Sequence, residues 1–128
     1  MPLTKVTEKD IASVSNQLGR PARDIIAIAA RCVCGNPVVV QTAPRLEDGT
    51  PFPTVYYLTL PAATSAVSTL ETSGLMMDLQ NRLTEEPELA SAYKRAHQSY
   101  LEDRALLGDV EEIEGISAGG MPTRVKCL

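Results

Sequence analysis

Two apolar runs on either side of a turn restrict the fold of this chain more than any other feature of its sequence. Residues 25–32 and 38–42 are rich in β-branched and small apolar side chains, and Gly35, Asn36 and Pro37 lie between them. Glycine, asparagine and proline together are typical of a tight turn. Because two strand-forming runs joined by a short turn pair with each other, we expect an antiparallel hairpin. The alanines of the first run are equally compatible with a helix.

The remaining pattern adds one strand and several helices to this hairpin. Residues 54–60 predict a third strand, after a loop at residues 43–53 that is rich in proline. Thr7 is expected to cap a first helix that Gly19 ends, and Thr84 is expected to cap the last helix. Apolar residues at helical spacing predict three further helices, over residues 61–73, 75–84 and 85–107. We therefore predict an α+β fold in which a small three-stranded antiparallel sheet packs against several helices.

Length and charge exclude several classes of protein. A chain of 128 residues suits one hydrophobic core, so we expect residues 1–128 to form a single domain. The net charge of -4 argues against a broad electropositive surface for duplex nucleic acid. No window approaches the roughly 18 apolar residues of a membrane span, and the first residues lack the apolar stretch of a signal peptide. We therefore expect a cytoplasmic protein.

Three cysteines are the most reactive side chains of the sequence. Cys32 and Cys34 lie at the predicted turn, and Cys127 lies near the end of the chain. An odd number of cysteines without an export signal predicts reduced thiols rather than disulfides. If the two ends of the chain meet, the three thiolates would suit zinc or an iron–sulfur cluster, since both favour sulfur ligands. Buried structural cysteines, or a redox-active or nucleophilic thiol, are the alternatives.

A catalytic thiol would need a base to activate it. Cys34 and Cys127 are the candidate nucleophiles, and His97 is the only histidine in the sequence. An imidazole can act as a general base or as a metal ligand, so His97 is a candidate for either role. The alternative is a partly exposed helical histidine without a role.

A glycine-rich segment near the C-terminus is a candidate anion site. Gly119 and Gly120 precede Arg124 and Lys126. Such segments present backbone N–H groups to phosphate when they lead into a helix. Arg45, in the loop at residues 43–53, is expected to join the same site. The segment matches no nucleotide-binding motif, and a flexible loop with solvated basic residues is the alternative.

Several stretches of the sequence resemble one bacterial family. They include Cys34-Gly35, residues 43–54, which read Ala-Pro-Arg-Leu-Glu-Asp-Gly-Thr-Pro-Phe-Pro-Thr, and the final Arg-Val-Lys-Cys-Leu. The chain resembles, over nearly its whole length, the family called "domain of unknown function 501", and the likeness is closest to its actinobacterial members. No activity is established for that family.

The resemblance implies an incomplete set of metal ligands. Family members carry cysteines at the positions of Cys34, Leu60 and Cys127, and a histidine shortly after the last of these. Cys34 and Cys127 match this pattern, Leu60 replaces the middle cysteine, and the sequence ends before the histidine. The resemblance also implies a further helical segment after Leu128, so we expect that a C-terminal segment is missing.

These observations predict a small binding or accessory protein. Its functional surface would combine the Cys-Gly-Asn-Pro turn, the Pro-Arg-Leu-Glu-Asp-Gly-Thr loop and the C-terminal glycine-rich segment, and it would hold a metal or an anion. The alternative is an enzyme that uses Cys34 or Cys127 as a nucleophile. A protein partner is expected to bind an exposed apolar patch, for which the candidates are Leu75, Met76 and Met77. The alternative is self-association at the surface on which the missing C-terminal segment would pack.

Overall fold

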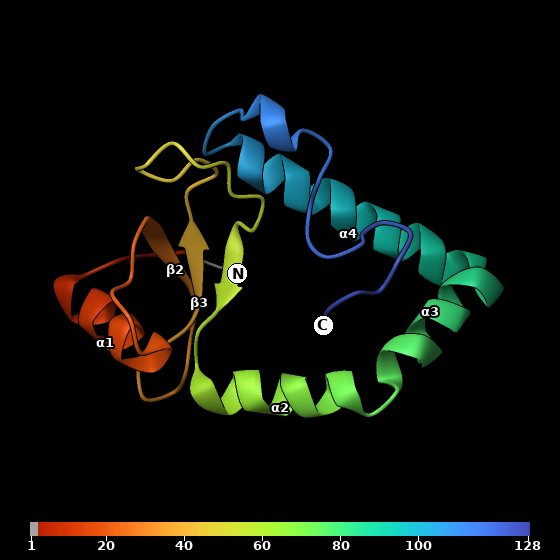
Figure 1. The fold of residues 1–128 in the computed structure, drawn as a ribbon, viewed down its shortest axis with the longest axis horizontal. Helices are drawn as coiled ribbons and strands as arrows, with labels where there is room; N and C mark the ends of the chain where they lie inside the picture. Colours follow the sequence, from red (N-terminus) through yellow and green to blue (C-terminus); the bar gives the residue numbers. More distant parts are fainter. Residues whose placement is uncertain (1–2) are drawn as a thin grey trace. The chain divides into compact units, whose positions relative to one another are not determined.

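The computed structural model describes residues 3–128, which fall into two compact units, one up to Ser65 and one from Ala66 to Leu128 (Figure 1). The first unit contains an antiparallel sheet and one helix, and the second unit is mainly helical. Strands and helices are thus segregated along the chain, which confirms the predicted α+β class.

The sheet of the first unit has four strands, so the prediction of three strands is wrong. The strands lie in sequence order and every neighbouring pair is antiparallel; they are β1 (Thr4–Lys5), β2 (Ile25–Arg31), β3 (Pro37–Thr42) and β4 (Tyr56–Leu58). The added strand, β1, is only two residues long and pairs with the middle of β2. A segment this short cannot show an alternating pattern, which explains why the sequence did not reveal it.

The hairpin of β2 and β3 confirms the prediction drawn from the two apolar runs. Residues 25–31 form a strand and not the helix that their alanines also allowed. Ile28 pairs with Val40, and Val40 in turn pairs with Tyr57 of β4. The register between β2 and β3 shifts at three points, and two of these lie in the half of β2 that leads into the turn, where the pairing is irregular.

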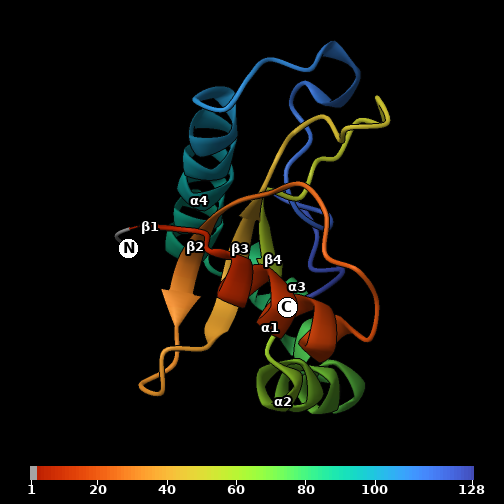
Figure 2. The ribbon, with the colours of Figure 1, turned by 90° about the vertical axis from the view of Figure 1, so that its left-hand side faces the viewer.

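Helix α1 (Glu8–Leu18) packs against one face of this sheet (Figure 2). Thr7 and Asp10 form a reciprocal capping box at its start, and Gly19 ends it in a left-handed conformation, as predicted. Val14 is fully buried against Ile28 and Val40. These contacts hold α1 across the hairpin, so that its polar residues lie close to the turn.

Three α-helices and a short 3-10 helix follow the sheet: α2 (Pro61–Thr72), α3 (Leu75–Glu85), α4 (Pro87–Ala105) and η1 (Glu111–Ile113). The cap of α4 is Glu86 and not Thr84, because Pro87 occupies the first helical turn and α3 continues to Glu85. Helix α4 also ends at Ala105, before Gly108.

Two further observations concern surfaces and membranes. Met77 is two-thirds exposed at 66%, whereas Leu75 and Met76 are half-buried. None of the helices within residues 3–128 combines the length and the apolar character that crossing a membrane requires.

Candidate functional site

The turn between β2 and β3 carries a disulfide bond. Cys32 and Cys34 are joined, with their Cα atoms 5.3 Å apart, and the prediction of reduced thiols is therefore wrong for this pair. The backbone N–H of Cys32 donates to the carbonyl of Asn36 at 2.9 Å, and the N–H of Gly35 donates to the carbonyl of Cys32 at 2.9 Å. Gly35 has a φ of 91°, which side-chain-bearing residues rarely adopt. We call residues 32–36 the thiol turn.

The thiol turn is open to solvent. Cys34 is exposed, Cys32 is half-buried, and Val33 between them is fully exposed. The bond closes a ring around a single intervening residue, so it does not link distant parts of the chain. The side of the turn formed by Val33 and Cys34 therefore faces reagents in solution.

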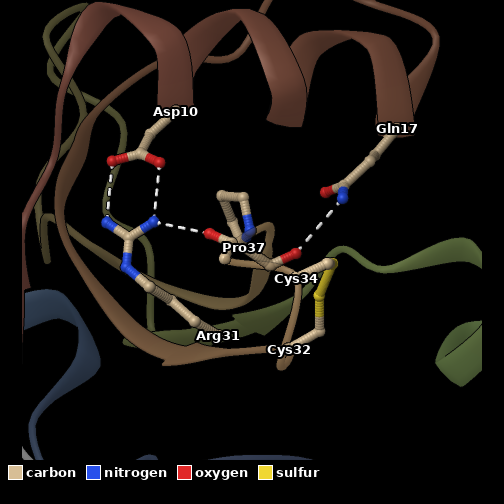
Figure 3. The surroundings of a disulfide bond; sticks show 7 residues. Asp10, Gln17, Arg31, Cys32, Cys34 and Pro37 are labelled. Carbon is tan, nitrogen blue, oxygen red and sulfur yellow. Dashed lines mark hydrogen bonds and ion pairs between the residues drawn. A yellow bond between two sulfur atoms is a disulfide. The ribbon is translucent and has the colours of Figure 1, made fainter.

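Arg31, the residue before the disulfide, ties the turn to α1 (Figure 3). Its Nη1 donates to Asp10 Oδ1 at 2.8 Å and to the carbonyl of Gly35 at 2.9 Å, and its Nη2 donates to Asp10 Oδ2 at 2.8 Å. Its Nε donates to Thr4 Oγ1 at 3.0 Å. In Figure 3 the Arg31 side chain points toward Asp10 and away from the two sulfurs. We call Arg31, Asp10 and the Gly35 carbonyl the Arg31 clamp.

The charges of the clamp stabilise each other. Hydrogen bonds from Arg31 hold the pKa of the Asp10 carboxyl far below its usual range, although burial acts in the opposite direction. The same contact raises the pKa of the Arg31 guanidinium. Asp10 is only 6% exposed, and a buried charge is costly unless it is paired. Arg31 compensates the charge, as does the backbone N–H of Thr7, which donates to Asp10 Oδ2 at 3.0 Å. Since the pair is neutral overall, it adds little net charge beside the thiols.

A second residue of α1 contacts the hairpin beyond the turn. Gln17 Nε2 donates to the carbonyl of Pro37 at 3.2 Å, as Figure 3 shows. Its Oε1 is buried and has no hydrogen-bond partner within residues 3–128. Of these two polar contacts between α1 and the hairpin, it is the Arg31 clamp that reaches the thiol turn itself.

The loop at residues 43–53 does not share a site with the thiol turn. The thiol turn lies before the start of β3 and the loop lies after its end (Figure 2), and the six residues of this strand separate them by about 20 Å. Arg45 donates to the carbonyl of Gly49 at 2.8 Å and so closes its own loop. The predicted surface that combined this loop with the turn is therefore divided within the first unit.

The C-terminal segment (residues 113–127) is held by polar side chains of α3 and α4. On α4, Tyr93 Oη donates to the carbonyl of Arg124 at 2.9 Å, and Arg104 donates to the carbonyls of Ile113 and Ile116. On α3, Gln80 Nε2 donates to the carbonyl of Thr123 at 3.2 Å. This segment runs beside α4 in Figure 1.

The glycines of this segment allow close backbone packing. A Cβ atom on Gly119 would lie 2.8 Å from Cys127 Sγ, and one on Gly120 would lie 2.6 Å from Arg124 Cβ. Absent side chains at these positions thus let the end of the chain fold back on the segment. Arg124 and Lys126 are both exposed. The predicted anion site of Gly119, Gly120, Arg124, Lys126 and Arg45 stays a prediction.

His97 is buried at 9% exposure, so the alternative of a partly exposed helical histidine is wrong. Its Nδ1 lies 2.7 Å from Ser117 Oγ, and Ser117 is 5% exposed. His97 lies one helical turn after Tyr93, and Arg104 follows two turns later on the same face. The sequence pattern did not assign His97 and Arg104 to this packed face, because the face was read from apolar and aromatic residues. The helical spacing of these two residues from Tyr93 was the available signal.

Cys127 belongs to the second unit and is an exposed, free cysteine. Within residues 3–128 no group of three or more histidine, cysteine or acidic side chains is arranged to hold a metal ion. A site over Cys32, Cys34 and Cys127 stays a prediction, and so does a nucleophilic role for Cys34 or Cys127.

A cavity of about 820 Å³ lies beside α1 in the first unit. Asp24, which lines it, has a φ of 58°, an uncommon conformation for a residue with a side chain. Its Oδ1 accepts from the N–H of Glu47 at 2.9 Å and its carbonyl accepts from the N–H of Ala43 at 3.1 Å. Aliphatic and aromatic side chains form most of the wall, among them Val14, Leu18, Ile25, Phe52 and Tyr57.

Comparison with known proteins identifies the family of this chain. The model of one family, described as "Protein of unknown function (DUF501)", matches residues 28–128. Comparisons with curated proteins and with solved structures produced no match. The match includes the thiol turn, the loop at residues 43–53 and the whole second unit. The chain therefore belongs to the DUF501 family of proteins of unknown function.

Proposed function

We propose that this protein carries out thiol–disulfide exchange, with Cys32 and Cys34 as the reactive pair. One observation carries the proposal: two cysteines, one residue apart, are bonded in an exposed turn. Exposed disulfides are the labile, regulatory or catalytic ones, whereas structural disulfides resist reduction.

The stabilising effect of this disulfide is small, which supports a chemical role. In the chain-entropy model, closing a loop of three residues contributes roughly 1.5 kcal/mol, about half the value for a loop of 15 residues. Backbone hydrogen bonds and the Arg31 clamp already hold the thiol turn. Reduction would therefore leave the hairpin folded, as a reversible redox pair requires.

The exchange would begin at Cys34, since Cys34 is the more exposed residue of the two. A low-molecular-weight thiolate attacks Cys34 Sγ, the bond between the two sulfurs breaks, and Cys32 leaves as a thiolate that takes up a proton. A second molecule of the thiol then attacks the mixed disulfide, and Cys34 leaves as a thiolate and is protonated in turn. Two small thiols become one small disulfide, and their two electrons reduce the protein. Oxidation is the reverse.

As a second candidate we retain a binding role, which the cavity beside α1 favours. Its volume of about 820 Å³ falls within the range of small-molecule sites, and its apolar wall with a few polar groups is typical of them. A zinc or iron–sulfur site would require the reduced form of the pair together with Cys127, because a disulfide cannot supply thiolates.

Equilibration with glutathione buffers tests the proposed function. The protein is incubated at graded ratios of reduced to oxidised glutathione, quenched with acid, alkylated and analysed by mass spectrometry. We expect Cys32 and Cys34 to titrate together as one two-electron couple, whereas Cys127 is alkylated independently. The Cys127→Ser variant, which retains the pair, is the control and should give the same titration.

Two results would contradict the function. A reduction potential below about -300 mV would mark a structural disulfide. An exchange rate no faster than that of a short peptide with the sequence Arg-Cys-Val-Cys-Gly-Asn-Pro would show that the folded protein adds nothing to the reaction. In the Cys32→Ser variant no second thiol of the pair can resolve the mixed disulfide at Cys34, so this adduct should accumulate, and its absence would contradict the proposed order of attack.

A further inference from the structure

We infer that Arg31 and Asp10 are positioning residues for the thiol pair, which hold the turn closed after the disulfide opens. This inference rests on the proposed exchange function and adds the residues that control its equilibrium. Neither side chain touches the reacting atoms, so their role is to keep the two sulfurs within bonding range in the reduced protein.

The geometry of the guanidinium carries the inference. Arg31 immediately precedes Cys32, and its Nη1 donates to the carbonyl of Gly35 at 2.9 Å. The side chain therefore bridges the entrance of the thiol turn and the residue that follows Cys34, without using either sulfur. Cys32 Sγ and Cys34 Sγ can separate while this bridge stays intact.

Asp10 sets the orientation of the bridge. Its two oxygens accept from Nη1 and Nη2 of Arg31, each at 2.8 Å. A paired contact of this kind restricts the plane of the guanidinium, and with it the direction in which Nη1 points at Gly35. Asp10 is itself held by the capping box at the start of α1, where its N–H donates to Thr7 Oγ1 at 3.1 Å. The position of the turn thus depends on a buried carboxylate of a packed helix.

The chemical consequence is a high effective concentration of one thiol toward the other. Holding two reacting groups in place converts a bimolecular encounter into an intramolecular step, which favours bond formation. A turn held at a Cα separation of 5.3 Å lies within the range that a disulfide requires. Asp10 stays ionised wherever thiols react, because its carboxyl pKa lies far below that range. The clamp is therefore intact under all conditions of the reaction.

The experiment measures the effective concentration of the pair from its equilibrium with glutathione. The variants are Asp10→Asn and Arg31→Lys, and the matched control is Gln17→Ala. Lysine keeps the positive charge but lacks the fork that contacts Asp10 and Gly35 together. Gln17→Ala removes another hydrogen bond from α1 to the same hairpin, at Pro37 rather than in the thiol turn. Circular dichroism establishes that each variant is folded.

We expect Asp10→Asn and Arg31→Lys to lower the effective concentration about tenfold, a rise of about 30 mV in reduction potential. Gln17→Ala should lower the stability without changing this value. An unchanged effective concentration in the folded Arg31→Lys variant would overturn the positioning role and leave the exchange function intact. An equal fall of the effective concentration in Gln17→Ala would do the same. If the wild-type protein exchanges no faster than the short peptide, the exchange function fails and the inference fails with it.

Discussion

Two arginines hold the thiol turn and the C-terminal segment, and their surroundings differ. Arg31 donates to the carbonyl of Gly35 and faces the carboxylate of Asp10, which raises the pKa of its guanidinium. Arg104 donates to the carbonyls of Ile113 and Ile116, and burial lowers the pKa of its guanidinium. Both side chains do the same structural task, which is to tie an irregular segment to a helix.

The difference shows that a contact between an arginine and the backbone of an irregular segment can depend mainly on a charged partner or mainly on burial. The Arg31 clamp depends on the ionised carboxylate of Asp10. Low pH, which protonates this carboxylate, or a substitution that removes its charge should therefore weaken the clamp. The Arg104 contact lies in a buried environment, where a backbone carbonyl that loses its donor is costly. We therefore expect the two segments to respond to different perturbations.

The largest effect should follow from Arg104→Met. Removal of the guanidinium leaves the carbonyl of Ile113 in a buried site, and that of Ile116 in a partly buried one, without this donor. We expect a loss of about 2–4 kcal/mol in unfolding free energy. Urea denaturation measures the loss. Arg95→Met, on the exposed side of the same helix, should have little effect. Equal losses in the two variants would show that Arg104 does not hold the segment.

A smaller, pH-dependent effect should follow from Asp10→Asn. The folded-state pKa of Asp10 is depressed, so its contribution is complete above the unfolded-state pKa of about 4 and is lost as the pH falls toward the folded-state pKa. We expect the unfolding free energy of the wild type to exceed that of the variant by about 2 kcal/mol at pH 7 and by progressively less below pH 4. Urea denaturation between pH 3 and pH 7 measures this. The loss caused by Arg104→Met should stay constant over that range, and a parallel decline would erase the distinction.

The smallest effect should distinguish two glycines. Gly35 and Gly119 both have positive φ, but a Cβ on Gly35 meets no atom within 4 Å, whereas one on Gly119 would lie 2.8 Å from Cys127 Sγ. Each alanine variant should lose about 1 kcal/mol from backbone strain. Removal of the sulfur in Cys127→Ala should restore part of the loss in Gly119→Ala and none in Gly35→Ala. Double-mutant cycles measure this coupling, and additive losses at Gly119 would show that the chain end does not pack there.

Local sequence signals predicted much of the first unit. Thr7, Asp10 and Gly19 define α1 because capping depends on residues within one helical turn. The β-branched runs define the hairpin for a similar reason, since a short turn brings the two runs together. The two-residue strand β1 was not predicted, because it is defined by its pairing with β2 and not by a pattern in its own residues.

The candidate site was predicted only in part. The Cys-x-Cys turn was identified from its spacing, but its oxidised state and the clamp of Arg31 and Asp10 were not. The bond between Asp10 and Arg31 was not predicted, because nothing in the sequence indicates that a residue 21 positions later donates to this carboxylate. Likewise, the contact of His97 with Ser117 links positions 20 residues apart.

The sequence by itself determined the elements that arise from neighbouring residues: the caps of α1, the turn, the β-branched strands and the pair of thiols. Only the tertiary structure decided which polar side chains reach across to which backbone carbonyls, at Gly35 for Arg31 and at Ile113 and Ile116 for Arg104. The physical reason is that caps and turns are set by interactions over a few residues. A contact between distant residues depends on packing that the whole chain creates.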